Sequence, residues 1–200
     1  FPTRRSSDLL GILMHPDNQD LPFPVILTGP RSAEAYLQQL HEFVGATLGH
    51  AAQRHYRIVI DDPAEVAKQM AQGLKEVKQF RRERNDAFHF NWMLKIDESF
   101  QRPFEPTHEN MASLQLSRSL PPHELAANLR RAFSGIVAGN VKDNGIRMIE
   151  QYGPYEIHGD PAVMLPLDRL LQAFVKQHRM KLPGGAAYVP CYRVVQTEAA

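Results

Sequence analysis

Two short apolar runs in the first third of the chain stand on either side of a segment with helical spacing. Residues 23–28 form the first run, bounded by Pro22 and Gly29-Pro30, and residues 56–60 form the second. Short continuous apolar runs are typical of buried parallel strands. The segment between them has apolar residues three or four positions apart: Leu37, Leu40, Phe43, Val44 and Leu48. This spacing predicts a helix over about residues 32–48.

A second helix follows the second run. Asp62-Pro63 is a good N-cap and first-turn pair, and Val66, Met70 and Leu74 continue the apolar stripe. Strand–helix–strand–helix with short connections predicts a doubly wound α/β unit. A complete sheet of this type needs more than two strands. We therefore expect residues 9–84 to be the C-terminal edge of such a unit, with residues 9–14 as the tail of a helix.

The charged run at residues 75–86 predicts a domain boundary, because such runs usually form solvated helix ends. Beyond it, residues 88–96 alternate like a half-buried strand. Further strands are predicted at 114–116 and 187–195, and helices at 122–141, 143–152 and 160–178. Residues 85–200 are therefore predicted to form an α+β domain.

Composition limits the function classes. The chain carries 23 Lys and Arg against 22 Asp and Glu, and this balance argues against a nucleic-acid or anionic-membrane surface. No apolar run approaches the roughly 20 residues of a membrane-spanning helix. The single cysteine, Cys191, excludes an intrachain disulfide and indicates a reducing cytoplasm. We interpret it as a small apolar residue in a strand.

The first nine residues, FPTRRSSDL, resemble the translation of a DNA-sequencing adapter. We expect residues 1–8 to be an artefact fused to a truncated protein that begins at Leu9 or Leu10. An export signal is the alternative, but the apolar run at 9–14 is shorter than a signal core. Without Arg4, Arg5 and Asp8, the charges are 23 − 2 = 21 basic and 22 − 1 = 21 acidic.

The ends of the two predicted parallel strands are candidate ligand positions, since loops and helix N-termini converge there. Thr28-Gly29 and Asp61-Asp62 occupy them. Glycine permits a phosphate or ribose to approach the backbone. Ordinary turns and helix caps are the alternative interpretation.

A second candidate lies at residues 130–142. Small residues punctuate this predicted helix at Ala132, Gly135, Ala138 and Gly139. Glycine costs a helix roughly 1 kcal/mol, which close packing or ligand approach usually offsets. Arg130, Arg131 and Lys142 could bind an anion such as a polyphosphate. The alternative is a tightly packed interface helix with solvated arginines.

Other motifs contribute less. His108 beside Glu109 could form an acid–base pair, although a hydrogen-bonded structural loop explains the segment more simply. The sequence has no phosphate-binding glycine loop, no GxSxG and no histidine pair at metal-ligand spacing. Residue chemistry alone therefore predicts no self-sufficient active site and no metal site.

Several runs, taken together, resemble the C-terminal half of bacterial pyrimidine/purine nucleotide 5′-monophosphate nucleosidases, relatives of the LOG proteins. The runs are residues 10–14, 24–30, 60–67, 104–111, 130–142 and 177–183. The resemblance implies a Rossmann-like LOG domain followed by a C-terminal domain. It also implies hydrolysis of AMP and other nucleoside monophosphates to free base and ribose 5-phosphate, without a cofactor.

The resemblance also shows a departure. The family's catalytic carboxylate and phosphate loop lie in a PGGxGTxxE motif just before the segment that matches residues 10–14, where this chain has residues 1–9. We therefore expect a fragment that is inactive alone, with no catalytic residue of its own and Thr28-Gly29 as substrate contacts.

The family further implies a homo-oligomer that responds to the alarmone (p)ppGpp. Arg130, Arg131 and Lys142, predicted above from their charge as an anion site, are the candidate contacts for that effector. The alternative function is a non-catalytic regulatory or assembly module that binds a nucleotide or the alarmone.

Overall fold

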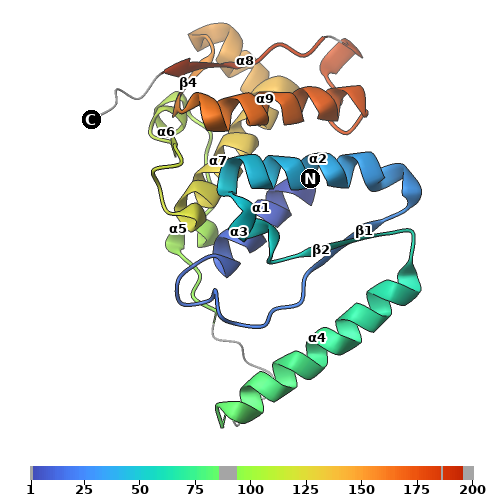
Figure 1. Cartoon of the computed structure of the whole chain (residues 1–200). Helices are drawn as coiled ribbons and strands as arrows, with labels where there is room; N and C mark the ends of the chain where they lie inside the picture. Colours follow the sequence, from blue (N-terminus) through green and yellow to red (C-terminus); the bar gives the residue numbers. More distant parts are fainter. Residues whose placement is uncertain (1, 86–93, 186, 196–200) are drawn as a thin grey trace.

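The computed structural model describes residues 2–85, 94–185 and 187–195. Its α-helices are α1 (Pro2–Leu13), α2 (Glu34–Leu48), α3 (His50–Gln53), α4 (Pro63–Glu83), α5 (Glu98–Gln101), α6 (His108–Ala112), α7 (Pro122–Val141), α8 (Asp143–Tyr152) and α9 (Pro161–Lys176). The strands are β1 (Ile26–Gly29), β2 (Arg57–Ile60), β3 (Gln115–Leu116), β4 (Tyr155–Gly159) and β5 (Tyr192–Val195), and 3-10 turns η1 (Arg31–Ala33) and η2 (Pro183–Gly185) complete the elements (Figure 1).

The first sheet pairs β1 with β2 in parallel, with Ile26 opposite Arg57 and Gly29 opposite Ile60. The predicted strand–helix–strand–helix order is confirmed here by β1, α2, β2 and α4. β1 begins at Ile26, later than predicted, because Pro22 and Pro24 have no N–H group for a ladder. At the other end of the unit, Asp62 caps α4 by accepting a hydrogen bond from the Glu65 N–H at 2.9 Å.

The second sheet is also parallel, in the order β3-β4-β5. The prediction of an α+β arrangement is therefore wrong for this sheet, because helices connect its successive strands as in α/β folds. The central strand, β4, was not predicted. Tyr155, Ile157 and Gly159 are buried, and the two residues between them are partly exposed, so β4 has the alternation of a strand with one face in the core. β5 begins only at Tyr192, because Pro190 cannot donate to a ladder.

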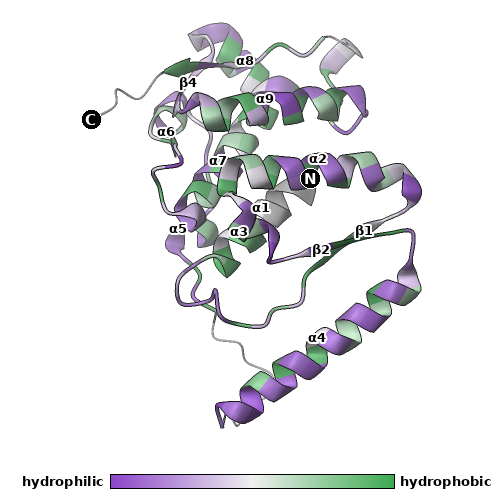
Figure 2. Cartoon of the chain, in the orientation of Figure 1, coloured by the Kyte–Doolittle hydropathy of each residue, from purple (hydrophilic) through white to green (hydrophobic). Residues whose placement is uncertain are grey.

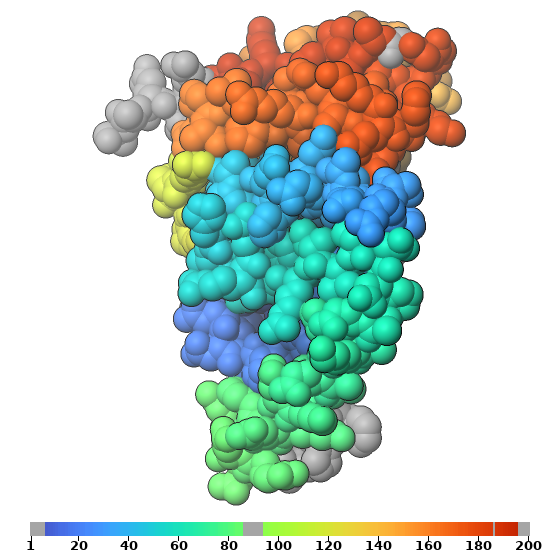
Figure 3. Space-filling model, turned by 45° about the vertical axis from the view of Figure 1, so that its right-hand side comes forward, coloured from blue at the N-terminus to red at the C-terminus, as the bar shows by residue number. Residues whose placement is uncertain are grey.

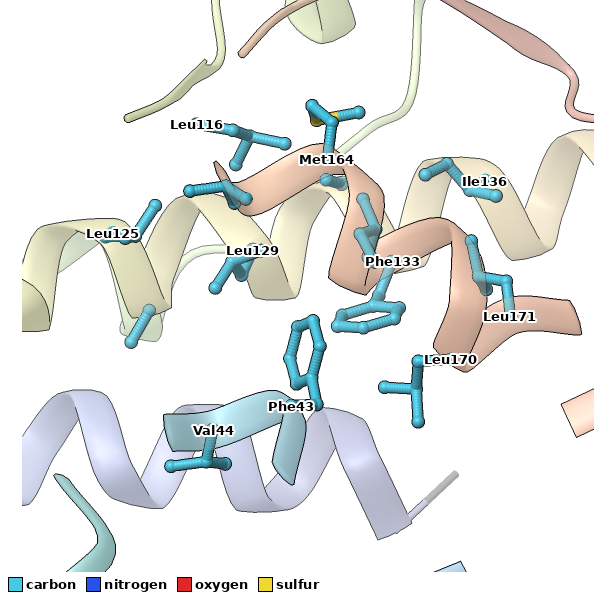
Figure 4. Packing of buried hydrophobic residues seen from close by; sticks show 14 of the residues in the cluster. Phe43, Val44, Leu116, Leu125, Leu129, Phe133, Ile136, Met164, Leu170 and Leu171 are labelled. Atoms are coloured by element: carbon cyan, nitrogen blue, oxygen red, sulfur yellow. The ribbon is translucent and has the colours of Figure 1, made fainter. Parts of the chain in front are cut away.

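One hydrophobic cluster runs through both predicted domains. It includes Leu40 and Phe43 from α2 together with Phe133 from α7 and Leu170 from α9. Figure 4 shows the rings of Phe43 and Phe133 turned toward each other; their centroids are 5.6 Å apart at 66°. The core is therefore continuous across the chain, while the domain division itself stays a prediction.

The helices differ in how they contribute to this core. α1 packs along α7, and α2 packs against α9 and α7. Figure 3 shows α2 between α9 above and the β2–α4 region below. α4 runs past β1 as a largely hydrophilic helix (Figure 2), with Gly73 against Pro24 as its buried contact with that segment.

Three sequence expectations about other segments have different outcomes. The helices predicted at 122–141 and 143–152 are confirmed at those bounds, and the one predicted at 160–178 ends at Lys176. The strand predicted at 88–96 falls mostly on residues outside the described ones. Among the described residues, no helix is long and apolar enough to span a membrane.

Candidate functional site

The carboxyl ends of β1 and β2 bring the two predicted ligand segments together. The Asp61 N–H donates to the Gly29 carbonyl at 2.9 Å, so Thr28-Gly29 and Asp61-Asp62 form one edge of the sheet. Thr28 is exposed at this edge. The N-terminus of the 21-residue helix α4 begins directly beside it. Exposed backbone N–H groups at such an edge favour anionic ligands.

Two residues at this edge have backbone positions that restrict which side chain can stand there. Asp61 has φ +54°, a left-handed conformation that non-glycine residues adopt uncommonly. Gly29 lies close to Ala33, and a Cβ at position 29 would be 2.9 Å from the Ala33 Cβ. The glycine is therefore explained by the tight passage from β1 into the η1 turn, with or without a ligand.

Two hollows near this sheet open away from this edge. One of about 540 Å³ opens at the amino ends of β1 and β2, between residues 19–26, 54–57 and α4. Another of about 980 Å³ lies between α2, α3 and the segment before α7, where Arg118 and Pro122 contribute to its wall. Neither is lined by Thr28 or Gly29. Ligands of open α/β sheets bind at the carboxyl ends of the strands, so the candidate edge is Thr28-Gly29 with Asp61-Asp62.

Arg130 is buried in α7 and forms an ion pair with α1. Its side chain is 8% exposed, and its Nε lies 2.5 Å from an Asp8 carboxylate oxygen. The N–H is not aligned with that oxygen, so the contact is an ion pair rather than a directed hydrogen bond. The sequence gives no sign of this partner, since Asp8 lies in the adapter-like segment. The guanidinium thus already faces a carboxylate anion.

Arg131 points toward a different segment. Its guanidinium donates to the Ser99 carbonyl at 3.4 Å and lies 5.8 Å from the centre of the Phe104 ring. Burial lowers the pKa of Arg131, and the positive charge of Arg130 adds to that effect. The two adjacent guanidinium groups are partly shielded from water, so an anion beside them is favoured.

Lys142 does not join the two arginines. It lies just beyond the C-terminal end of α7, whereas the arginines lie in the middle of the helix; at 1.5 Å per residue the helix separates Lys142 from Arg131 by about 17 Å. The three cations predicted as one anion site are therefore divided into an arginine pair and a distant lysine.

His108 has a structural setting. Its Nε2 lies 2.8 Å from the Gly153 carbonyl, and its ring packs 4.7 Å from that of Tyr155. The Tyr155 hydroxyl in turn donates to the Pro106 carbonyl at 3.1 Å. These contacts support the hydrogen-bonded loop over an acid–base pair with Glu109.

The small residues of α7 allow close packing within the chain. A Cβ at Gly135 would lie 2.2 Å from the Met111 sulfur, and one at Gly139 would lie 2.8 Å from the Cys191 sulfur. Close packing is thus the observed use of these glycines. Asn140 donates to the Cys191 sulfur at 2.9 Å on the same side.

The setting of Cys191 predicts an inert thiol. The residue is 6% exposed, and burial raises the pKa of its thiol from 9.0 to about 12. This raised pKa lowers the thiolate fraction at pH 8 on the order of 1,000-fold. Because the thiolate is the nucleophile, the thiol should react correspondingly slowly. We expect Ellman's reagent to leave native protein unmodified and to react with one thiol per chain in urea. Rapid modification of native protein at pH 8 would contradict this burial.

Sequence analysis also missed a group of titratable side chains far apart in the chain. His15, Asp97 and His123 lie together after folding, with one potential ligand atom from each within 4.8 Å of the others. No local motif contains two of them, so no spacing rule could have found the group.

Comparison with known proteins gives a family. Residues 74–195 match the family described as pyrimidine/purine nucleotide monophosphate nucleosidase, C-terminal. Pyrimidine/purine nucleotide 5′-monophosphate nucleosidases of Escherichia coli strain K12 and of Escherichia coli O157:H7 are each 59% identical over 186 residues, which is 93% of this chain and 41% of theirs. The chain spans about two fifths of the length of these curated relatives.

Proposed function

Because the chain belongs to the pyrimidine/purine nucleotide monophosphate nucleosidase family, we propose that it is the C-terminal part of an enzyme that cleaves nucleoside 5′-monophosphates. The reaction is hydrolysis of the N-glycosidic bond of AMP and other purine and pyrimidine nucleotides, giving free base and ribose 5-phosphate. The observation that carries this proposal is 59% identity over 93% of the chain to the Escherichia coli nucleosidase. No cofactor is assigned to this reaction.

Two roles are proposed for the two parts of the chain. Residues 9–84 are the edge of a LOG-type Rossmann-like sheet, which the parallel β1–β2 pair and its following helices support. Residues 85–200 are the nucleosidase C-terminal domain, which the family match over 74–195 supports. In this arrangement α1 and α2 share a core with α7 and α9, so the two parts hold each other in position.

Substrate contact is proposed at Thr28-Gly29. The exposed threonine at the end of β1 can donate its hydroxyl to a phosphate or ribose oxygen. The carboxylate that stabilises the ribosyl cation is assigned to the PGGxGTxxE motif, which these 200 residues do not contain. The chain alone is therefore proposed to be inactive.

An effector contact is proposed at Arg130 and Arg131, where a polyphosphate such as (p)ppGpp would compete with Asp8 for a guanidinium. Lys142 would serve as a separate contact at the C-terminal end of α7. Assembly into a cytoplasmic homo-oligomer completes the proposal. A non-catalytic regulatory module that binds a nucleotide or the alarmone through the same arginines is the second candidate.

A chimera tests the catalytic proposal. Residues 10–195 replace the matching part of the Escherichia coli nucleosidase, and release of ribose 5-phosphate from AMP is measured beside the 200-residue chain. We expect an active chimera and an inactive chain. Thr28→Val in the chimera should lower kcat/KM about tenfold, the effect of one hydrogen bond to a charged group. Ser113→Ala removes an exposed hydroxyl elsewhere and serves as the control.

The outcomes separate the two candidates. A folded chimera without activity, or a Thr28→Val variant equal to Ser113→Ala, would contradict the substrate role. Calorimetric titration of the 200-residue chain with (p)ppGpp and with AMP then tests the module. If the folded chimera is inactive, binding of either ligand that Arg131→Ala abolishes favours the regulatory candidate.

A further inference from the structure

Three segments distant in sequence bring imidazole and carboxylate groups to one place. His15 follows α1, Asp97 precedes α5, and His123 lies in the first turn of α7. The His15 Nε2 is 3.6 Å from an Asp97 carboxylate oxygen, and the His15 and His123 rings are 5.1 Å apart. Both histidine side chains are largely buried, at 14% and 13% exposed.

Local packing fixes these segments against each other. The buried Asn18 amide donates to the carbonyls of Ile12 and Lys95 at 2.7 Å, and its oxygen accepts from the Lys95 N–H at 2.9 Å. Asn18 therefore joins the end of α1 to the segment that carries Asp97. Gly11 allows the Phe100 ring to lie on α1, since a Cβ there would be 2.2 Å from that ring. α7 packs along α1 and supplies His123.

The imidazole and carboxylate groups of this cluster suit a divalent cation such as zinc, which binds both nitrogen and oxygen ligands. Two imidazole nitrogens and one carboxylate, with a position left for water, form a ligand set that zinc uses in proteins. Metal–ligand bonds near 2.0 to 2.2 Å in a tetrahedral site place neighbouring ligand atoms about 3.4 Å apart. The distance of 3.6 Å from His15 Nε2 to the Asp97 carboxylate oxygen is close to that spacing. All three ligand atoms lie within 4.8 Å of one another, so the side chains need to move together by little more than about 1 Å to bind one ion.

Groups behind His15 can support the bound form. At present the Asp17 N–H donates to His15 Nδ1 at 3.1 Å, so the neutral ring carries its proton on Nε2. A cation on Nε2 requires the other tautomer, with the proton on Nδ1. That tautomer gives up the hydrogen bond from the Asp17 N–H, and the Asp17 carboxylate, 3.8 Å from Nδ1, is available to accept the Nδ1 proton in its place. Carboxylates commonly orient metal-binding histidines in this way.

We propose that His15, Asp97 and His123 form a binding site for one divalent transition-metal ion of the zinc type. The ion would link the end of α1, the segment before α5 and the start of α7. The site shares no residue with the sheet edge at Thr28-Gly29, and its occupancy does not depend on catalysis.

Cobalt(II) titration tests the site, because tetrahedral cobalt absorbs visible light with a characteristic pattern and substitutes for zinc. The 200-residue chain is titrated with Co²⁺, and Zn²⁺ is then used to displace it. We expect one equivalent to give the tetrahedral spectrum. His123→Gln and Asp97→Asn should each weaken binding at least about 100-fold, and Asp17→Asn about tenfold.

His50→Gln is the matched control, since His50 is an exposed histidine at the start of α3. Far-UV circular dichroism establishes that each variant is folded. The proposal is overturned if the folded wild-type chain gives no tetrahedral spectrum at one equivalent. It is equally overturned if His123→Gln and Asp97→Asn bind Co²⁺ as tightly as His50→Gln does.

Discussion

Phe133→Ala is expected to lower the free energy of unfolding by about 4 kcal/mol, within the range measured for buried Phe to Ala changes. Phe133 is 4% exposed, and its ring meets that of Phe43 edge-on at 5.6 Å. Truncation leaves a cavity at the junction of α2, α7 and α9 (Figure 4). Urea unfolding followed by far- and near-UV circular dichroism measures the change.

The cooperativity of that transition matters as much as its midpoint. Because the core is continuous, both signals should shift together in the variant. Leu165→Ala, at a position 58% exposed on α9, is the control and should change stability by less than about 0.5 kcal/mol. A double-mutant cycle with Phe43→Ala should show a coupling of about 1 kcal/mol. Two separate transitions, only one of them shifted, would instead support independent domains on either side of residue 85.

Gly145→Ala is expected to destabilise the protein by about 3 kcal/mol, against the prediction from helix propensity. Gly145 lies in α8, where alanine is ordinarily better by about 1 kcal/mol. A Cβ at this position would lie 2.2 Å from the Ala138 carbonyl oxygen and 2.5 Å from its carbon. Backbone atoms cannot rotate away as a side chain can. The same carbonyl accepts the Lys142 N–H at 3.0 Å, so the corner between α7 and α8 must shift.

The sign of this effect is the test. Thermal and urea unfolding of Gly145→Ala are compared with those of Glu150→Ala, an exposed change in the same helix. The control should alter stability by less than about 0.5 kcal/mol. A Gly145→Ala variant as stable as wild type would show that α7 and α8 do not approach as closely as described.

The sequence pattern predicted best those helices whose apolar periodicity and terminal residues agree. α7 and α8 have strong periodicity and clear termini, and their bounds match the prediction. The strand β4 was missed although Tyr155 and Ile157 alternate with Glu156 and His158, because the run is short and lies between two helices. The prolines near β1 and β5 shortened both strands, which shows that backbone donors limit a strand more than apolar character does.

The candidate sites were harder to predict, because they depend on tertiary contacts. Thr28-Gly29 could be placed from the strand rule, and the structure joins it to Asp61. The ion pair of Arg130 with Asp8 and the separation of Lys142 required the packing of α1 on α7. The group of His15, Asp97 and His123 has no local signature at all, since each residue comes from a different segment.

Because α2 packs on α9, the core cannot be completed until both helices have been synthesised. Phe43 leaves the ribosome well before Phe174, and both belong to one core. At translation rates of 5–20 residues per second, the interval between them is on the order of ten seconds. During that time the apolar face of α2 has no α9 to cover it. The final core can therefore form only when the segment that carries α9 has emerged.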